Sequence, residues 1–147
     1  MESRIDYYAA APEVMKAMLA LEKAVVTSGL EKSLIELVKT RASQINGCAF
    51  CIDMHTRDAM KGGETATRLL LLDAWREAPF YSPRERAALA WTEALTLISE
   101  THAPDEDWAT LKAEFSEAEI VKLSLLIATI NAWNRLAIGF RSVPVGK

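Results

Sequence analysis

The sequence predicts an all-α fold of about seven helices in a single domain. Apolar residues recur at helical spacing along almost the whole chain, and signals that begin or end a helix follow one another at regular distances. Alternating apolar and polar residues, which would indicate strands, are absent. The chain has 147 residues and no internal repeat or linker, so we expect one domain spanning 1–147.

The first two helices are expected over 12–28 and 31–45. Pro12 suits the first turn of a helix, and Gly29 provides an end for it. In the second helix the apolar residues lie three or four positions apart, as in a buried stripe; they are Leu34, Leu37, Val38, Ala42 and Ile45. Asn46-Gly47 then interrupts the helical pattern.

Five further helices are expected after this interruption. The third begins near Cys48 and ends at Gly62-Gly63, and the fourth covers 64–77. The clearest starts are SPRE at 82–85 and SEAE at 116–119, where a serine is followed three residues later by a glutamate, as in a capping box. These starts open helices over 82–100 and 116–138, with a shorter helix over 105–114 between them.

Composition and charge exclude several classes of protein. Half of the residues are hydrophobic, a quarter are charged, and six glycines and five prolines are too few for a disordered or collagen-like chain. The net charge of −3 and the lack of a basic cluster argue against nucleic acid as a partner. The longest uncharged stretch, 123–134, is shorter than the ~20 residues of a membrane span, and the N-terminus lacks the features of a secretory signal. We therefore expect a cytoplasmic protein without membrane contact.

The two cysteines of the chain, Cys48 and Cys51, are three residues apart, and His55 follows one helical turn later. On a helix that turns about 100° per residue, the three side chains fall within ~60° of one another and share one narrow face. A cysteine attacks as its thiolate, which a neighbouring imidazole can generate and a helix N-terminus can stabilise. The spacing also allows the two sulfurs to close a disulfide, so the residues are typical of a redox-active dithiol.

Two other interpretations of these residues stay open. Both cysteines could be core residues, since cysteine is among the most buried residue types. Alternatively, Cys48, Cys51 and His55 could bind zinc, with His102 completing the site from a predicted loop. Zinc binding would crowd three ligands from one helix onto one side of the metal, and the chain has no second CxxC pair.

The segment 36–55, ELVKTRASQINGCAFCIDMH, resembles the AhpD-like alkylhydroperoxidases of the carboxymuconolactone decarboxylase superfamily. The resemblance continues through 62–64, 74–77, 82–89 and 131–135 and so covers most of the chain. It implies an AhpD-like helical fold. It also implies a thiol-dependent peroxidase that reduces hydrogen peroxide or organic hydroperoxides.

The resemblance also implies a role for each candidate site residue. Cys51 would be the peroxidatic thiol and Cys48 the resolving thiol, while Glu36 and His55 would form a proton relay. Attack on a peroxide would convert Cys51 to a sulfenic acid, Cys48 would condense with it to a disulfide, and an external dithiol would restore both thiols. That reductant would be a thiol or a lipoyl-carrying protein with a dihydrolipoyl group. No bound cofactor or metal is implied, and the expected assembly is a homotrimer or homohexamer.

Three nearby residues complicate this interpretation. Phe50 lies between the cysteines, where the best-studied branch of the family has a histidine of the relay, and its apolar ring fits either a hydrophobic peroxide or simple packing. Glu36 projects about 100° from Leu37 of the buried stripe, toward the polar face, unless that face meets the cysteine helix or another subunit. Asp58, three residues after His55, either orients the imidazole or is a surface charge.

The last predicted helix is apolar almost all round, which places it in the centre of the domain or between subunits. Asn131, Trp133 and Asn134 follow its most apolar part. Buried asparagines need hydrogen-bond partners, so these residues line the active site or contact another subunit.

Two other functions compete with the peroxidase. The superfamily name implies a decarboxylase or a related lactone-processing enzyme, but that branch does not depend on a CxxC dithiol. A redox-sensing or binding module would use the same two cysteines to change its oligomeric state.

Overall fold

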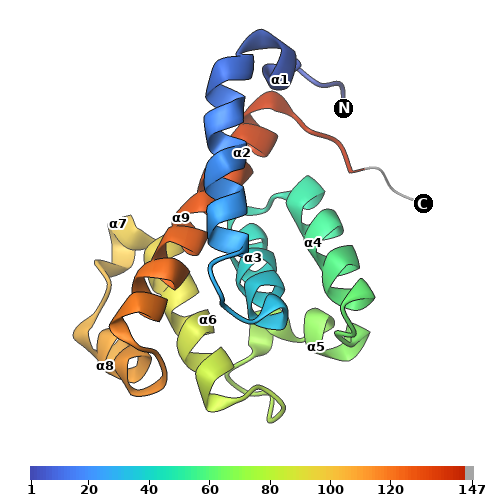
Figure 1. Ribbon diagram of the computed structural model, residues 1–147. Coiled ribbons are helices and arrows are strands. Elements are labelled where there is room, and N and C mark those ends of the chain that lie inside the picture. Colours follow the sequence, from blue (N-terminus) through green and yellow to red (C-terminus); the bar gives the residue numbers. More distant parts are fainter. Residues whose placement is uncertain (145–147) are drawn as a thin grey trace.

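Helices make up all the regular secondary structure of residues 1–144, the part of the chain that the computed structural model describes (Figure 1). In this part there are nine α-helices and one 3-10 helix: α1 (Tyr7–Ala10), α2 (Pro12–Val26), α3 (Lys32–Asn46), α4 (Ala49–Lys61), α5 (Ala66–Leu70), η1 (Leu72–Ala74), α6 (Pro83–Thr96), α7 (Ile98–Thr101), α8 (Asp105–Glu114) and α9 (Glu117–Phe140). The predicted all-α fold is confirmed, with more and shorter helices than the seven expected.

The helix starts that the sequence predicts most clearly are found in the structure. Pro12 and Pro83 lie in the first turns of α2 and α6. Ser82 and Ser116 both form the expected capping box. In each box the serine side chain accepts a hydrogen bond from the backbone N–H of the glutamate three residues later, and the glutamate side chain accepts one from the backbone N–H of the serine. These caps satisfy N–H groups that would otherwise lack partners, and they fix where α6 and α9 begin.

The helix predicted over 64–77 is instead divided into α5, η1 and a turn. The buried residues of this region are Leu69, Leu72 and Trp75, followed by Ala78. They lie three positions apart and pack together with Leu37 of α3. A repeat of three matches the three residues per turn of a 3-10 helix better than the 3.6 of an α-helix. One continuous α-helix would have rotated part of this set toward solvent.

Two shorter differences concern the ends of helices. The helix predicted over 82–100 is interrupted at Leu97, which separates α6 from α7. A hydrogen bond from Thr101 Oγ1 to Ala94 O (2.6 Å) links the end of α7 to α6. The four-residue helix α1 was not predicted, because it is too short to show periodicity. Its start is nevertheless marked by Asp6, whose carboxylate accepts hydrogen bonds from two backbone N–H groups of α1.

α3 lies at the centre of the fold and packs against α4, α6 and α9 (Figure 1). The main core fills the space between α3, α6, α8 and α9, and its fully buried members include Val38, Ala87, Leu111, Leu123 and Leu126. A second cluster lies beside it, between α3, the end of α4, α5 and α6. Because α3 is enclosed in this way, its side chains are held in fixed positions relative to α4.

The 24-residue helix α9 is long and apolar enough, by length and composition alone, to cross a membrane. The uncharged stretch 123–134 is only part of this helix, so its length alone underestimates how long the apolar helix is. A central helix of a globular core passes the same test, and α9 is such a helix: Ile127 and Ile130 are fully buried, and it packs against α2, α3, α6 and α8. Of the two predicted locations, the packing of α9 supports the centre of the domain.

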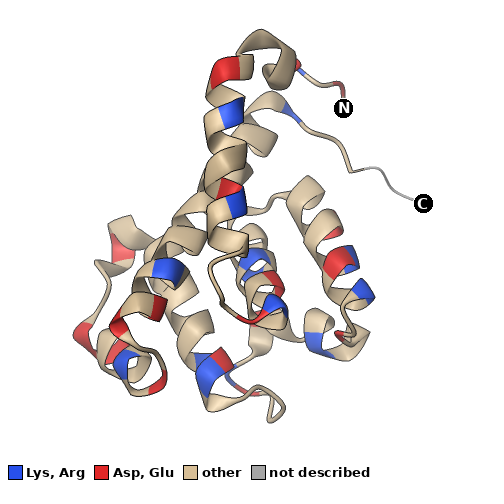
Figure 2. Ribbon diagram, in the orientation of Figure 1, with Lys and Arg blue, Asp and Glu red and all other residues tan. Residues whose placement is uncertain are grey.

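Acidic and basic residues are interleaved along the outer helices, for example on α4 and α8 (Figure 2). One ion-pair cluster joins three segments: Glu93 of α6 accepts hydrogen bonds from Arg41 of α3 (3.0 Å), Trp75 (2.8 Å) and Arg76. Burial alone would raise the pKa of Glu93, but the hydrogen bonds from Arg76 and Trp75 outweigh it and lower the pKa. The cluster fixes α3, which carries Glu36, against α6.

Candidate active site

Cys48 and Cys51 are joined by a disulfide at the start of α4, with their Cα atoms 5.3 Å apart. α3 ends at Gly47, whose left-handed backbone (φ +69°) turns the chain into the next helix. Cys48 is the N-cap of α4, and its Sγ accepts a hydrogen bond from the N–H of Cys51 (3.4 Å). Cys48 lies near the start of the helix, as the sequence predicts, at the N-cap position directly before Ala49. Its sulfur is bonded to that of Cys51.

The start of α4 favours the thiolate form of both cysteines once the disulfide is reduced. Backbone N–H groups in the first turn point toward the helix start, and the helix dipole places partial positive charge there. Both effects stabilise a thiolate relative to a thiol. The residues themselves are almost inaccessible, with exposed fractions of 1% for Cys48 and 2% for Cys51, so any reagent must reach the sulfurs through a cavity.

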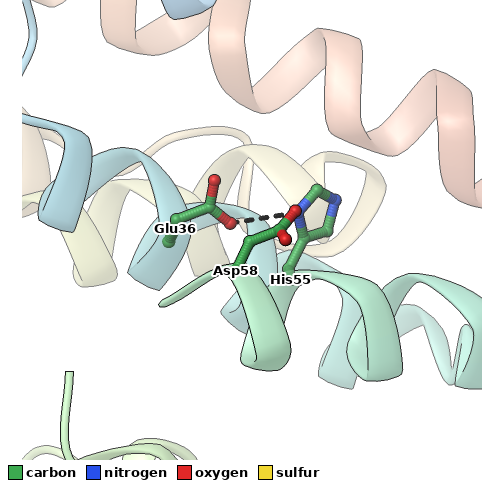
Figure 3. A group of neighbouring side chains, drawn as sticks. All are labelled: Glu36, His55 and Asp58. Carbon is green, nitrogen blue, oxygen red and sulfur yellow. Dashed lines mark hydrogen bonds and ion pairs between the residues drawn. The ribbon is translucent and has the colours of Figure 1, made fainter. Parts of the chain in front are cut away.

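His55 lies one turn after Cys51 on α4 and is also buried. Its Nδ1 lies 3.1 Å from Oε2 of Glu36 on α3 (Figure 3). A carboxylate only accepts hydrogen bonds, so Nδ1 donates to Glu36 and Nε2 of the neutral ring remains able to take up a proton. The structure therefore brings together three of the predicted site residues from two helices that pack against each other.

The structure resolves the question that the sequence raised about Glu36. Its place beside the apolar stripe predicts a location on the polar face of α3, and the side chain is partly exposed (22%). α4 packs against α3 on this side, because His55 of α4 is within hydrogen-bond distance of Glu36. Glu36 therefore reaches His55 within one subunit, and no neighbouring subunit is needed to explain its position.

Asp58 lies near the same imidazole but on the exposed side of α4 (Figure 3). One donor atom from each of Glu36, His55 and Asp58 lies within 4.8 Å of the others. Two carboxylates and an imidazole could hold a divalent cation. Neither cysteine belongs to this group, nor does His102, which ends α7 in a left-handed conformation. The zinc site considered in the sequence analysis thus differs from the arrangement in residues 1–144, where the two sulfurs are bonded to each other.

A cavity of about 280 Å³ opens beside Cys51 and His55. Its remaining walls come from α1, α2, α4 and α9 and consist of Tyr7, Tyr8, Glu22, Phe50, Met54, Trp133 and Ala137. We call it the aromatic cavity. Burial raises the pKa of Tyr8, and the neighbouring Tyr7 and Glu22 add to the effect, so the phenol beside the cavity stays neutral near pH 7.

Sequence reasoning missed an ion pair behind this cavity. Lys39 of α3 is buried (4% exposed) and pairs with Glu22 of α2, whose other oxygen accepts a hydrogen bond from Trp133 Nε1 (3.1 Å). The ion pair and the hydrogen bond together occupy both oxygens of Glu22, and the hydrogen bond fixes the indole ring of Trp133 at the cavity wall. A signal was present, because Lys39 interrupts the buried residues of α3, but nothing in one sequence indicates its partner on α2.

The asparagines after the apolar part of α9 find partners within the subunit. Asn134 is fully buried, donates to Ser43 Oγ (3.0 Å) and accepts from Asn46 Nδ2 (2.9 Å). Asn131 accepts from the same Asn46 amide (2.9 Å) and donates to Thr96 Oγ1 (3.1 Å). These bonds tie α9 to the end of α3, directly before the Gly47 turn, and no subunit interface is required to explain them.

Known proteins resemble this chain in sequence and in fold. The model of the carboxymuconolactone decarboxylase family matches residues 12–94. The chain is 49% identical to the uncharacterised protein YdfG of Bacillus subtilis over 147 residues, all of both chains. A solved structure from Agrobacterium tumefaciens, described as a protein of unknown function and a candidate antioxidant defence protein AhpD, has 49% identity and a TM-score of 0.97 and covers 99% of this chain and 100% of its own. A peroxidase-related protein from Silicibacter shares the fold at 23% identity and a TM-score of 0.82, covering 93% of this chain and 73% of its own.

Proposed function

The chain is an AhpD-like member of the carboxymuconolactone decarboxylase family, and from this we propose that it is a thiol-dependent peroxidase. Its substrates would be hydrogen peroxide or organic hydroperoxides, reduced by a Cys48/Cys51 dithiol. The observation that carries the proposal is that Cys51 and His55 line one cavity, with His55 bound to Glu36 on its other side. This arrangement holds a nucleophile and a base in the positions that nucleophilic catalysis needs.

The first step is attack by the Cys51 thiolate on a peroxide in the aromatic cavity. An S–O bond forms and the O–O bond breaks, so that Cys51 is oxidised to a sulfenic acid and the peroxide is reduced. His55 takes the proton of the Cys51 thiol at Nε2 and passes it to the leaving oxygen, which departs as an alcohol, or as water when the substrate is hydrogen peroxide. Glu36 acts through the imidazole, because its carboxylate orients the ring and balances the charge that His55 carries while it holds a proton.

In the second step Cys48 attacks the sulfenic sulfur. The S–S bond forms, the S–O bond breaks, and the departing hydroxide takes a proton to become water. The product is the disulfide found in the structure, so the geometry of this state is already accommodated at the start of α4. Two electrons and two protons from an external dithiol, such as a dihydrolipoyl group, then restore both thiols.

The apolar walls of the aromatic cavity favour a peroxide with a hydrophobic substituent. Phe50, Met54 and Trp133 line the cavity beside Cys51, and contact between these side chains and an apolar group removes apolar surface from water, which is favourable. Phe50 replaces a polar relay residue at this point, so the proton must be handled by His55 and Glu36. We expect hydrogen peroxide to be the poorer substrate of the two classes.

The proposal extends to cofactors, partners and assembly. No bound cofactor enters any step, and we expect peroxidase activity to survive treatment with a chelator. The partners would be a small peroxide and a thiol reductant or a lipoyl-carrying protein, in a reducing cytoplasm where thiols are maintained. We expect a homotrimer or homohexamer, without nucleic acid or membrane partners.

Steady-state peroxide consumption with a dithiol reductant tests the proposal. We expect turnover with cumene hydroperoxide in the wild type and none in Cys51→Ser. A decarboxylase of this fold would not need the dithiol, and a redox-sensing module would form the disulfide without turning over. Undiminished peroxidase activity in the double variant Cys48→Ser/Cys51→Ser would refute the proposal.

A further inference from the structure

The two cysteines of the disulfide line different cavities. Cys51 lines the aromatic cavity, together with His55. Cys48 lines a second cavity of about 230 Å³, bounded by Gly47, Ala49 and the end of α9 and called here the Cys48 cavity. Phe50 and Ala137 contribute to both cavities and therefore form the partition between them. Each cysteine of the disulfide is thus adjacent to its own cavity.

We infer that the reductant enters through the Cys48 cavity and attacks Sγ of Cys48, while the peroxide uses the aromatic cavity. The inference rests on the proposed function and adds which sulfur is attacked and where the reductant binds. Thiol–disulfide exchange requires the attacking sulfur to approach along the S–S axis, opposite the sulfur that leaves. An approach from the Cys48 cavity meets Cys48 first and expels Cys51.

Attack at Cys48 also releases the sulfur that the peroxide step needs. Cys51 lines the aromatic cavity together with His55, whose imidazole can exchange a proton with the departing sulfur. Attack at Cys48 therefore regenerates the Cys51 thiolate directly, in the cavity where the next peroxide binds.

The size and walls of the Cys48 cavity define its occupant. A volume of about 230 Å³ is below the usual range for sites that bind drug-sized ligands. Because Cys48 is only 1% exposed, a thiol fixed on the surface of a folded protein would not reach it. The cavity fits a dithiol of a few heavy atoms at the end of a slender, flexible arm, as in a dihydrolipoyl group. Ile138 and Arg141, both exposed, flank the entrance.

The exchange balances in two displacements. One thiolate of the reductant bonds to Cys48 Sγ, the Cys48–Cys51 bond breaks, and Cys51 leaves as a thiolate. The second thiol of the reductant then attacks its own partner sulfur, closing a cyclic disulfide and releasing Cys48, which takes up the proton. The protein disulfide is reduced by two electrons, and the dithiol is oxidised by two.

A trapping experiment on the wild-type protein identifies the attacked sulfur. The oxidised protein is incubated with a dihydrolipoamide analogue in which one thiol is blocked, in the presence of iodoacetamide to alkylate the cysteine that is released. Peptide mass spectrometry then locates the adduct. We expect the analogue on Cys48 and the alkyl group on Cys51. The reverse pattern, or an equal mixture of both, would overturn the inference.

Two tryptophan substitutions test the separation of the cavities. Ile138→Trp places a bulky ring at the Cys48 cavity, and Met54→Trp does so at the aromatic cavity; both native side chains are exposed. We expect Ile138→Trp to slow reduction by dihydrolipoamide about tenfold or more while single-turnover oxidation by peroxide keeps its rate, and Met54→Trp to show the opposite pattern. Leu70→Trp, an exposed residue of α5, is the matched control and should change neither rate.

These outcomes separate the inference from the function on which it rests. If peroxide oxidises Cys51 normally but Ile138→Trp is reduced at the wild-type rate, the location of the reductant site is wrong and the peroxidase stands. If the wild type forms no disulfide with peroxide, the proposed function itself fails.

Discussion

Nδ1 of His55 and Oε2 of Glu36 lie 3.1 Å apart, although the two residues belong to different helices. The contact exists because α3 and α4, which are joined by the turn at Gly47, pack against each other. The disulfide lies directly after the same turn. One turn between two helices therefore determines where the sulfurs lie and which way the imidazole faces. The proposed chemistry depends on this packing as much as on the identity of the residues.

Glu36→Gln should slow the peroxide step while leaving the cysteines intact. A glutamine can still contact Nδ1 but cannot balance the charge of a protonated imidazole, so we expect disulfide formation about 100-fold slower in a single turnover. Stopped-flow mixing of the reduced protein with cumene hydroperoxide measures this rate. Asp53→Asn is the matched control, because Asp53 lies on α4 and pairs with Arg57 away from the site. Equal rates in both variants would remove Glu36 from the mechanism.

Cys48→Ser should stop the cycle after one oxidation. Without a resolving thiol, the sulfenic acid at Cys51 persists and reacts with dimedone, which adds one mass label to the peptide that contains Cys51. Intact-protein mass spectrometry after one equivalent of peroxide measures the adduct. Cys51→Ser, treated in the same way, should remain unlabelled. A label on Cys48 in that variant would mean that the two roles are exchanged.

The capping box of α9 predicts a loss of stability in acid. The hydrogen bond from Arg84, and then the backbone N–H of Ser116, lower the pKa of Glu119 from 4.5 to about 2. The folded state therefore binds this proton less tightly than the unfolded state, so the stabilisation is complete above about pH 4.5 and is lost as the pH falls toward 2.

Glu119→Gln isolates that charge effect, because glutamine preserves the hydrogen bond to the N-cap. We expect the variant to be less stable at pH 7 by at most about 1 kcal/mol, since solvent screens a partly exposed ion pair, and to lose less stability between pH 4.5 and 2. Thermal melts across this pH range measure the difference. Glu117→Gln, exposed in the same turn, is the control. A pH dependence identical to that of the wild type would contradict the assignment.

Asn134→Ala should destabilise the junction between α3 and α9. The substitution leaves Ser43 and Asn46 without their buried partner, which we expect to cost about 2 kcal/mol in the free energy of unfolding. Urea denaturation measures the loss. Ala128→Ser, on the exposed side of the same helix, should change the value by less than about 0.5 kcal/mol. A similarly small change in Asn134→Ala would show that this network adds little to stability.

Much of the fold was predictable because its signals are local. The serine caps at Ser82 and Ser116 fix helix starts through bonds within one turn, and the stripe from Leu34 to Ile45 marks the buried face of α3. The region 64–77 was predicted wrongly, since its charges and leucines suit a helix while its buried residues repeat every third position. Only the packing against Leu37 shows that the three-residue repeat, and not the α-helical pattern, determines the structure of this region.

The candidate site was predictable to the extent that its residues are neighbours in sequence. Cys48, Cys51 and His55 share one segment, so their proximity follows from helix geometry with a small correction for the N-cap. Glu36 depended on the family resemblance, because its helical face alone indicates solvent. The pair of Lys39 and Glu22 could not be predicted, since a contact between α2 and α3 leaves no periodic signal in one chain.

The central claim is that Cys48 and Cys51 form a dithiol that peroxide oxidises. The most direct measurement is the thiol state of the fully reduced wild-type protein, followed by mass spectrometry after addition of one equivalent of cumene hydroperoxide. We expect an intramolecular Cys48–Cys51 disulfide within seconds, with consumption of the peroxide. Two free thiols and unreacted peroxide after several minutes would contradict the claim.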